Sequence, residues 1–274
     1  MLAPQRHERL LTMLRADGAV RITDAALALD VSDMTVRRDL AEMAEQGLVR
    51  KVHGGAVLPH ATTHEPGFEA KRTHSVGEKE AIARAALPLV APDSAIALSA
   101  GTTTSILAGL VAADASLRPL TVVTNSLPVA EILHATGDGQ IETILTGGTR
   151  TPSDALVGPV AERTLATLHV DVAFVGAHGV GADAGLTTPN IVEGATNAAL
   201  IAGAGRTVAL ADHTKWEETG LSRFADLRDV DVLVTDDGLE PEAQAAARDL
   251  VGELVVAAVA PSTTETETET GESA

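Results

Sequence analysis

From Pro92 onward the chain alternates short apolar segments with alanine-rich segments of helical length. We expect strands at 95–99, 120–124, 141–145, 171–176, 206–211, 231–235 and 253–258, and helices at 77–89, 103–112, 127–135, 159–168, 191–203 and 241–251. Strands that alternate with helices form a mostly parallel sheet with helices on both faces. The pattern therefore predicts a Rossmann-like α/β domain over residues 76–260.

The N-terminal part of the chain has a different pattern, with three predicted helices. The first spans residues 4–15, and the second runs over residues 23–29 with Thr23 as its cap. The third begins at Ser32, whose hydroxyl can accept a hydrogen bond from an amide one turn on. Gly47 is expected to end it, as glycine often does.

The third predicted helix has an apolar side and a basic side. A stripe expected to face a small core contains Val36, Leu40 and Met43, and the opposite arc contains Met34, Arg37 and Arg38. A short capped helix of this kind is typical of the helix that a helix-turn-helix protein places in the major groove of DNA. Arg37 or Arg38 could pair with a guanine edge, and Thr35 with a phosphate or a thymine methyl. Asp39, beside the arginines, is expected to be a structural ion-pair partner.

The segment LVRKVHGGAVLP follows this helix and predicts a two-stranded wing that turns at Gly54-Gly55. Arg50, Lys51 and His53 on the wing are candidate contacts to the DNA backbone, together with Ser32, Thr35, Arg37 and Arg38 on the helix. The alternative is an ordinary three-helix domain with arginines on a solvated face. The capped helix, the paired arginines and the basic hairpin together favour a winged helix-turn-helix domain over residues 1–59.

The net charge of −18 is unusual for a DNA-binding protein, but its distribution is uneven. Residues 1–59 hold eight basic and eight acidic residues, so the remaining chain carries the whole excess of acid. An acidic surface could disfavour non-specific DNA binding, although its more ordinary role is to maintain solubility. The absence of cysteine, of a signal peptide and of a long apolar run predicts a cytoplasmic protein.

Polar loops follow several of the predicted strands. Gly101, Thr102, Thr103 and Thr104 lie between a strand and a helix, where backbone amides and hydroxyls can form a cradle for an anion. The next two strands are followed by Thr124, Asn125 and Ser126 and by Gly147 and Gly148. Loops at the carboxyl ends of neighbouring parallel strands converge on one crevice, so these residues are candidate ligand contacts. Asn125, Gly147 and Gly148 could each equally have a turn role, whereas the alternative for the loop at 101–104 is a strand-helix turn with a capping threonine.

Lys215 follows the strand at 206–211 and is the candidate cation for a bound phosphate. Asp212 could accept from a sugar hydroxyl or hold Lys215 in place. Glu193, at the start of a predicted helix, either caps that helix or contacts the ligand. His178 and His213 lack the spacing of a metal site, so we expect no metal and no cofactor.

The motif SDMTVRRDL, followed by EQGLVRKVHGGAVL, is similar to the DNA-binding domain of the DeoR family of bacterial regulators of sugar metabolism. The similarity continues in that family's order through LSAGTTT, VVTNS, LTGGTR, DVAFVGAHGV and ALADHTKW. The resemblance implies a C-terminal domain that resembles sugar-phosphate isomerases in fold and binds a phosphorylated sugar or related metabolite. The family often has aspartate where this chain has Ser99, and a serine binds sugar hydroxyls more weakly than a carboxylate does.

The resemblance implies a non-enzymatic repressor of a carbohydrate-utilisation operon. It is expected to bind operator DNA as a homodimer or homotetramer and to be released by the effector. The alternatives are an activator and an isomerase-like enzyme with an appended DNA-binding domain, in which Glu193 and Asp212 would be candidate bases. Residues 60–75 are expected to be a linker, and residues 261–274 a disordered acidic tail.

Overall fold

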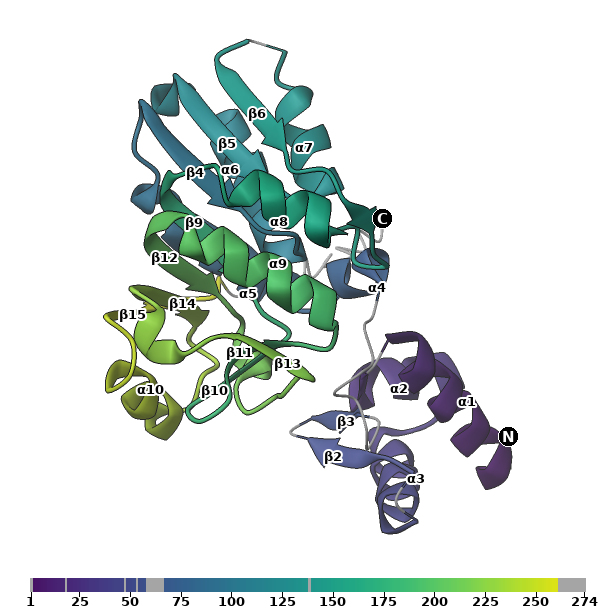
Figure 1. The fold of residues 1–274 in the computed structure, drawn as a ribbon. Coiled ribbons are helices and arrows are strands. Elements are labelled where there is room, and N and C mark those ends of the chain that lie inside the picture. Colours follow the sequence, from purple (N-terminus) through teal and green to yellow (C-terminus); the bar gives the residue numbers. More distant parts are fainter. Residues whose placement is uncertain are drawn as a thin grey trace, which may run out of the picture.

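The computed structural model describes residues 2–17, 19–46, 48–52, 54–57, 67–137 and 139–260 (Figure 1). The N-terminal part contains α1 (Ala3–Asp17), β1 (Ala19–Arg21), α2 (Ile22–Leu29), α3 (Asp33–Glu45), β2 (Arg50–Val52) and β3 (Gly55–Val57). Its strands form an antiparallel sheet in the order β1-β3-β2. The three helices and the hairpin agree with the sequence prediction, whereas β1 is an additional strand.

The small N-terminal core forms where the apolar stripes of its helices meet. Val36, Leu40 and Met43 of α3 are at most 1% exposed and pack with Leu10 and Leu14 of α1. The hydroxyl of Ser32 accepts the Thr35 amide at 3.2 Å, so the predicted cap of α3 is confirmed.

The predicted cap of α2 is wrong. The helix begins at Ile22, and Arg21 occupies the capping position without a side-chain cap bond. Thr23 lies inside the first turn, where its hydroxyl donates to Asp24. The predicted end of α3 at Gly47 lies outside the described residues.

The turn between the wing strands requires two glycines, each for a different reason. Gly54 has φ of +78°, which favours glycine. A Cβ at Gly55 would lie 2.1 Å from the Val20 carbonyl oxygen, because β3 pairs closely with β1. The turn at Gly54-Gly55 is therefore confirmed.

The C-terminal part is built on a parallel sheet of seven strands in the order β15-β14-β12-β9-β4-β5-β6. The strands are β4 (Ser94–Leu98), β5 (Leu120–Thr124), β6 (Ile141–Leu145), β9 (Val170–Gly176), β12 (Ala204–Leu210), β14 (Val232–Asp236) and β15 (Glu253–Ala257). All seven predicted strands are present within two residues of the expected bounds, which confirms the α/β fold class.

Helices cover both faces of this sheet (Figure 1). One face packs against α5 (Val76–Ala86), α6 (Thr102–Ala113) and α7 (Leu127–His134), and the other against α8 (Pro159–Leu165), α9 (Ile191–Ala202) and α10 (Pro241–Arg248). Side chains alternate between the two cores along each strand, as the pleat requires. On β9, Phe174 enters the first core, and Ala173 and Val175 enter the second.

Several short elements were not predicted. They are α4 (Phe68–Arg72), β7 (Thr149–Arg150), β8 (Leu156–Val157), β10 (Gly179–Gly181), β11 (Gly185–Thr188), β13 (Ser222–Ala225) and the 3-10 turns Ala115–Leu117, His213–Lys215 and Leu227–Asp229. The end of the helix predicted at 77–89 is the 3-10 turn Leu87–Leu89. Helix α4 lies within the segment 60–75 that was expected to be a linker. Across the described part of the chain, the helices are too short or too polar to cross a bilayer.

The reversal of strand order determines where a ligand can bind. The chain proceeds from β4 through β5 to β6 on one side, and then returns to place β9, β12, β14 and β15 on the other side of β4. In open α/β sheets a crevice forms at the carboxyl ends of the strands where the order reverses. Here that position lies between β4 and β9.

Replacing Phe174 with alanine should lower the free energy of unfolding of the C-terminal domain by about 3–5 kcal/mol. The side chain is fully buried in the centre of the sheet, so its loss leaves a cavity. Urea unfolding followed by the fluorescence of Trp216, the single tryptophan of the chain, measures this domain. Val160→Ala, at a side chain 53% exposed, is the control and should change stability by less than about 0.5 kcal/mol.

Candidate functional site

The exposed side of α3 carries the predicted DNA contacts. Arg37 and Arg38 are exposed, Met34 beside them is 73% exposed, and Lys51 on β2 is also exposed. Arg38 donates to Glu42 at 3.3 Å in a surface pair that is weak enough for a phosphate or base to replace. The side chain of Arg50 and all of His53 lie outside the described residues.

Asp39 connects α3 to α1. Its carboxylate is 2% exposed and accepts two bonds from Arg6, at 2.6 and 2.9 Å. The hydrogen bond from the Arg6 guanidinium holds the pKa of Asp39 below its usual value. The structural ion-pair role expected for Asp39 is confirmed, with Arg6 as the partner.

The same carboxylate belongs to a group that could in principle hold a metal ion. Ligand atoms of His7, Asp39 and Glu42 lie within 4.8 Å of one another. The Arg6 guanidinium already occupies both oxygens of Asp39, however, and a cation there would repel a metal.

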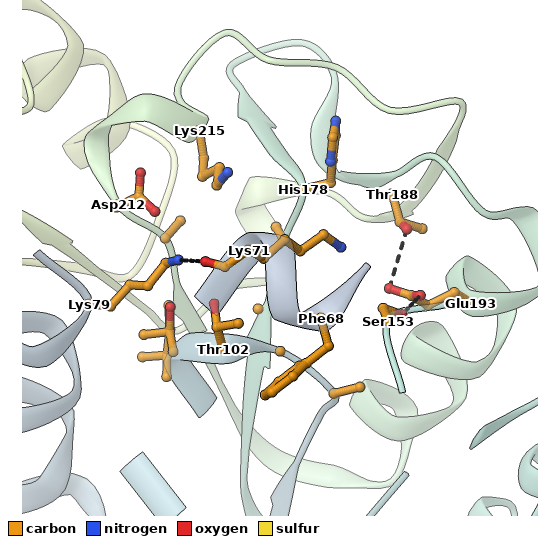
Figure 2. Close-up of a pocket in the computed structure, with 17 residues that line it drawn as sticks. Phe68, Lys71, Lys79, Thr102, Ser153, His178, Thr188, Glu193, Asp212 and Lys215 are labelled. Atoms are coloured by element: carbon orange, nitrogen blue, oxygen red, sulfur yellow. Dashed lines mark hydrogen bonds between the residues drawn. The ribbon is translucent and has the colours of Figure 1, made fainter. Parts of the chain in front are cut away.

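A pocket lies at the reversal point of the large sheet, at the carboxyl ends of β4, β9 and β12 (Figure 2). The predicted ligand residues that line it are Gly101, Thr102, Thr103, Glu193, Asp212 and Lys215. The side chains that line it without having been predicted are Phe68, Lys71, Lys79, Ser153, His178 and Thr188. Residues at the ends of β4, β9 and β12 complete the lining, namely Ala100, 176–177 and 210–211.

One end of the pocket is cationic. Lys79 and Lys215 approach it from α5 and from the turn after β12, beside Thr102 at the start of α6 (Figure 2). The first amides of a helix have no partner within the helix, and its N-terminus carries partial positive charge. Asp212 accepts from the amide and the hydroxyl of Thr214, and so fixes the turn that carries Lys215.

Lys79 is a buried cation of this end, at 5% exposure. Its ammonium donates to the carbonyl oxygens of Lys71 and His74, both at 2.6 Å. Burial lowers the pKa of Lys79 to about 8, opposed by Asp212 and assisted by Lys215, Lys71 and Arg21. An anion bound nearby would restore the charged form.

The other end of the pocket is acidic and hydroxylated. Glu193 accepts from Ser153 at 2.9 Å and from Thr188 at 3.4 Å (Figure 2). The cap of α9 is Asn190, whose side chain accepts the Val192 and Glu193 amides. Of the two roles considered for Glu193, the cap therefore belongs to Asn190, and the Glu193 carboxylate lines the pocket.

Five predicted ligand residues form a buried layer outside the pocket lining. They are Ser99, Thr104, Thr124, Asn125 and Ser126, each with 0% exposure. Ser99 accepts the Gly176 amide at 3.0 Å, and Asn125 accepts the Ala100 amide at 2.9 Å. This layer thus holds the backbone of the β4 and β9 ends, which does line the pocket.

Gly147 and Gly148 also lie away from the pocket. Their φ values are +70° and +125°, and a Cβ at Gly148 would lie 2.6 Å from the Val157 carbonyl oxygen. Gly148 thus permits the close approach of β7 and β8.

A winged helix-turn-helix joined to an α/β domain with a polar pocket at its reversal point defines a DNA-binding regulator with a sensor domain. Two family models match the chain, the DeoR-like helix-turn-helix domain over residues 6–62 and the DeoR C-terminal sensor domain over residues 74–237. The chain belongs to the DeoR family of transcriptional regulators.

Named relatives match over most of their length. The putative aga operon transcriptional repressor of Escherichia coli O157:H7 is 30% identical, over 86% of this chain and 87% of that protein. The glycerol-3-phosphate regulon repressor of Escherichia coli K12 is 30% identical, over 86% of this chain and 92% of that protein. The regulator GolR of Listeria innocua is 32% identical, over 85% of this chain and 90% of that protein.

Among solved structures, the chain is similar to ribose 5-phosphate isomerase A from Methanocaldococcus jannaschii. The identity is 18% and the TM-score is 0.38, over 50% of this chain and 53% of that one. A similarity of this extent carries no argument about activity.

Replacing both Arg37 and Arg38 with alanine should abolish sequence-specific DNA binding without unfolding the domain, because both side chains are exposed. Binding to a duplex selected from a random pool by the full-length protein is measured at fixed salt. Arg9→Ala, at an exposed arginine of α1, is the matched control and should retain binding. Specific binding by the double variant would exclude α3 as the recognition helix.

The affinity for a phosphate monoester should fall as pH rises above about 8, where Lys79 loses its proton. The monoester itself is already dianionic there, since its second pKa is about 6. We expect a loss of up to about tenfold per pH unit, measured by calorimetry between pH 7 and pH 9.5. The Lys79→Met variant should bind the monoester weakly, with an affinity that does not depend on pH in this range. A wild-type affinity that does not change with pH would contradict a role of Lys79 in binding the phosphate.

Proposed function

We propose that this protein is a repressor of a carbohydrate-utilisation operon, and that a phosphorylated sugar or related metabolite in the pocket releases it from DNA. Such a ligand acts by its different affinity for the DNA-binding and the released conformations. The protein would act in the cytoplasm, where its operator is located.

The polarity of the pocket carries this proposal. Lys79, Lys215 and the start of α6 gather at one end, and Glu193 with its two hydroxyl partners at the other (Figure 2). The first end suits a phosphate, which favours cations and helix N-termini. The second suits sugar hydroxyls, which donate to a carboxylate.

The position of Phe68 favours a sugar as the part of the ligand that lies between these ends. It lies on the wall that connects them, and its ring is 9% exposed (Figure 2). An aromatic face can contact the apolar C–H surface of a sugar ring while the polar groups bind its hydroxyls.

The names of the relatives agree with this class of regulated genes. One is named as a repressor of an aga operon and another as the repressor of a glycerol-3-phosphate regulon. We extend to this chain the role of repressor and the control of carbohydrate genes. A homodimer or homotetramer is proposed because half-site readers usually match a two-fold operator.

A thermal-shift screen of the full-length protein tests the effector class. Sugar phosphates and sugar-alcohol phosphates are compared with their unphosphorylated partners. A ligand at one hundred times its dissociation constant should add about 2.7 kcal/mol of stability. Stabilisation by free sugars alone would overturn the phosphate assignment, and conversion of a stabilising ligand to its isomer would support the enzyme alternative.

Lys215→Ala should weaken the phosphorylated ligand by about tenfold or more, because a hydrogen bond to a charged group contributes about 1.5–3 kcal/mol. The affinity for the dephosphorylated partner should change little. Calorimetry measures both, and Lys51→Ala on the wing is the control with unchanged affinity. Equal weakening of the two ligands would remove Lys215 from the phosphate end.

A further inference from the structure

Helix α4 belongs both to the pocket and to the connection between the two domains. It is the first described element after the segment 58–66. Its residues Phe68 and Lys71 line the pocket, and the helix contacts α1 of the DNA-binding domain as well as α6 of the sensor domain. A wall of the ligand site is therefore formed by the chain that connects the domains.

Lys79 holds the C-terminal end of this wall in place. Helix α4 has five residues, too few for a helix to be stable by itself. The Lys79 ammonium donates to the Lys71 and His74 carbonyls at its C-terminal end, where the helix dipole attracts a cation. An ammonium has three protons, so a third remains for an anion in the pocket that Lys79 also lines.

The next residue along the chain is bonded to the DNA-binding domain. Ser75 has φ of +50°, an uncommon conformation for a residue other than glycine, and is 6% exposed. Its hydroxyl accepts a hydrogen bond from the Arg21 guanidinium at 2.6 Å. Arg21 ends β1, pairs with Gly55 of the wing and directly precedes α2.

These contacts form a continuous connection from the pocket to the helix-turn-helix. We propose that effector binding is transmitted through Lys79, the segment Lys71–Ser75 and Arg21, which together we call the Lys79–Arg21 relay. An anion that accepts the remaining proton draws the Lys79 ammonium toward the pocket and so lengthens its hydrogen bonds to the Lys71 and His74 carbonyls. Ser75 then shifts, its bond to Arg21 changes, and the DNA-binding domain is reoriented. The relay rests on the proposed function, because it requires an anionic effector.

The contact between α1 and α4 is a second route between the same parts, so the Arg21–Ser75 bond must be tested by itself. Arg21→Ala removes the donor. Ser75→Gly removes the acceptor and tolerates the positive φ, so it avoids the strain that alanine would add. Both variants leave the lining of the pocket and the exposed side of α3 intact.

The experiment measures coupling in the full-length protein. The dissociation constant for a duplex selected from a random pool is determined with and without saturating inorganic phosphate, at constant ionic strength. The ratio of the two constants is the coupling factor, for which we expect about fivefold or more in the wild type. Phosphate binding to each variant is measured separately by calorimetry.

Arg21→Ala and Ser75→Gly should each reduce the coupling factor to near one while phosphate affinity is retained. The double variant should be no worse than either single variant, because both remove the same bond. Arg84→Ala, at an exposed arginine of α5, is the control and should keep the wild-type factor.

Each other outcome is decisive. Wild-type coupling in Arg21→Ala would overturn the relay and leave the proposed function standing. A wild-type protein that binds phosphate without any change in DNA affinity would overturn both the relay and effector control by this group. A wild-type protein that binds no phosphate would overturn the anionic ligand class, and the relay with it.

Discussion

The position of the pocket depends on one constraint, the order in which seven parallel strands bury both faces of a sheet. Each strand carries apolar side chains into two separate cores, so its order and register cannot change without exposing one of them. β4 and β9 are parallel neighbours, but the chain after β4 continues to one face of the sheet and the chain after β9 to the other. The loops after these two strands therefore diverge. The space between those loops is the pocket. The acidic and basic groups that line it are held there by a core that contains almost no aromatic residues.

The strands could be predicted from the sequence because each carries apolar residues for both faces of the sheet within a short segment, a purely local signal. Their order could not be predicted, since it follows from long-range packing. This explains why the candidate residues after β5 and β6 lie outside the pocket lining. Thr102 and Asp212 follow β4 and β12, near the reversal, and line the pocket. Asn125 and Gly148 follow β5 and β6, on the far side of β4, and hold backbone segments together instead. In all four cases the sequence showed the same signal, a polar loop directly after a strand, so it could not separate the two groups.

The missed residues differ in how far a sequence could reveal them. Lys79 shares one helical stripe with Ile82, Ala83 and Ala86, which are all fully buried, and a lysine in an apolar stripe is a recognisable sign of a special role. Ser153 and Phe68 carried no such sign, because distant parts of the chain bring them to the site. In the DNA-binding domain, Thr23 had the right chemistry for a cap but stood one residue inside a helix that starts at Ile22.

The position of helix α4 affects where the boundary of the sensor domain should be placed. The match to the sensor-domain family begins at residue 74, after α4 has ended. A fragment cut at that boundary would keep every strand of the large sheet and both of its cores. It would lack Phe68 and Lys71, and the Lys79 ammonium would lose the Lys71 carbonyl that it binds. The part of the chain that the family model matches and the part that lines the pocket thus have different limits, and the second extends toward the DNA-binding domain.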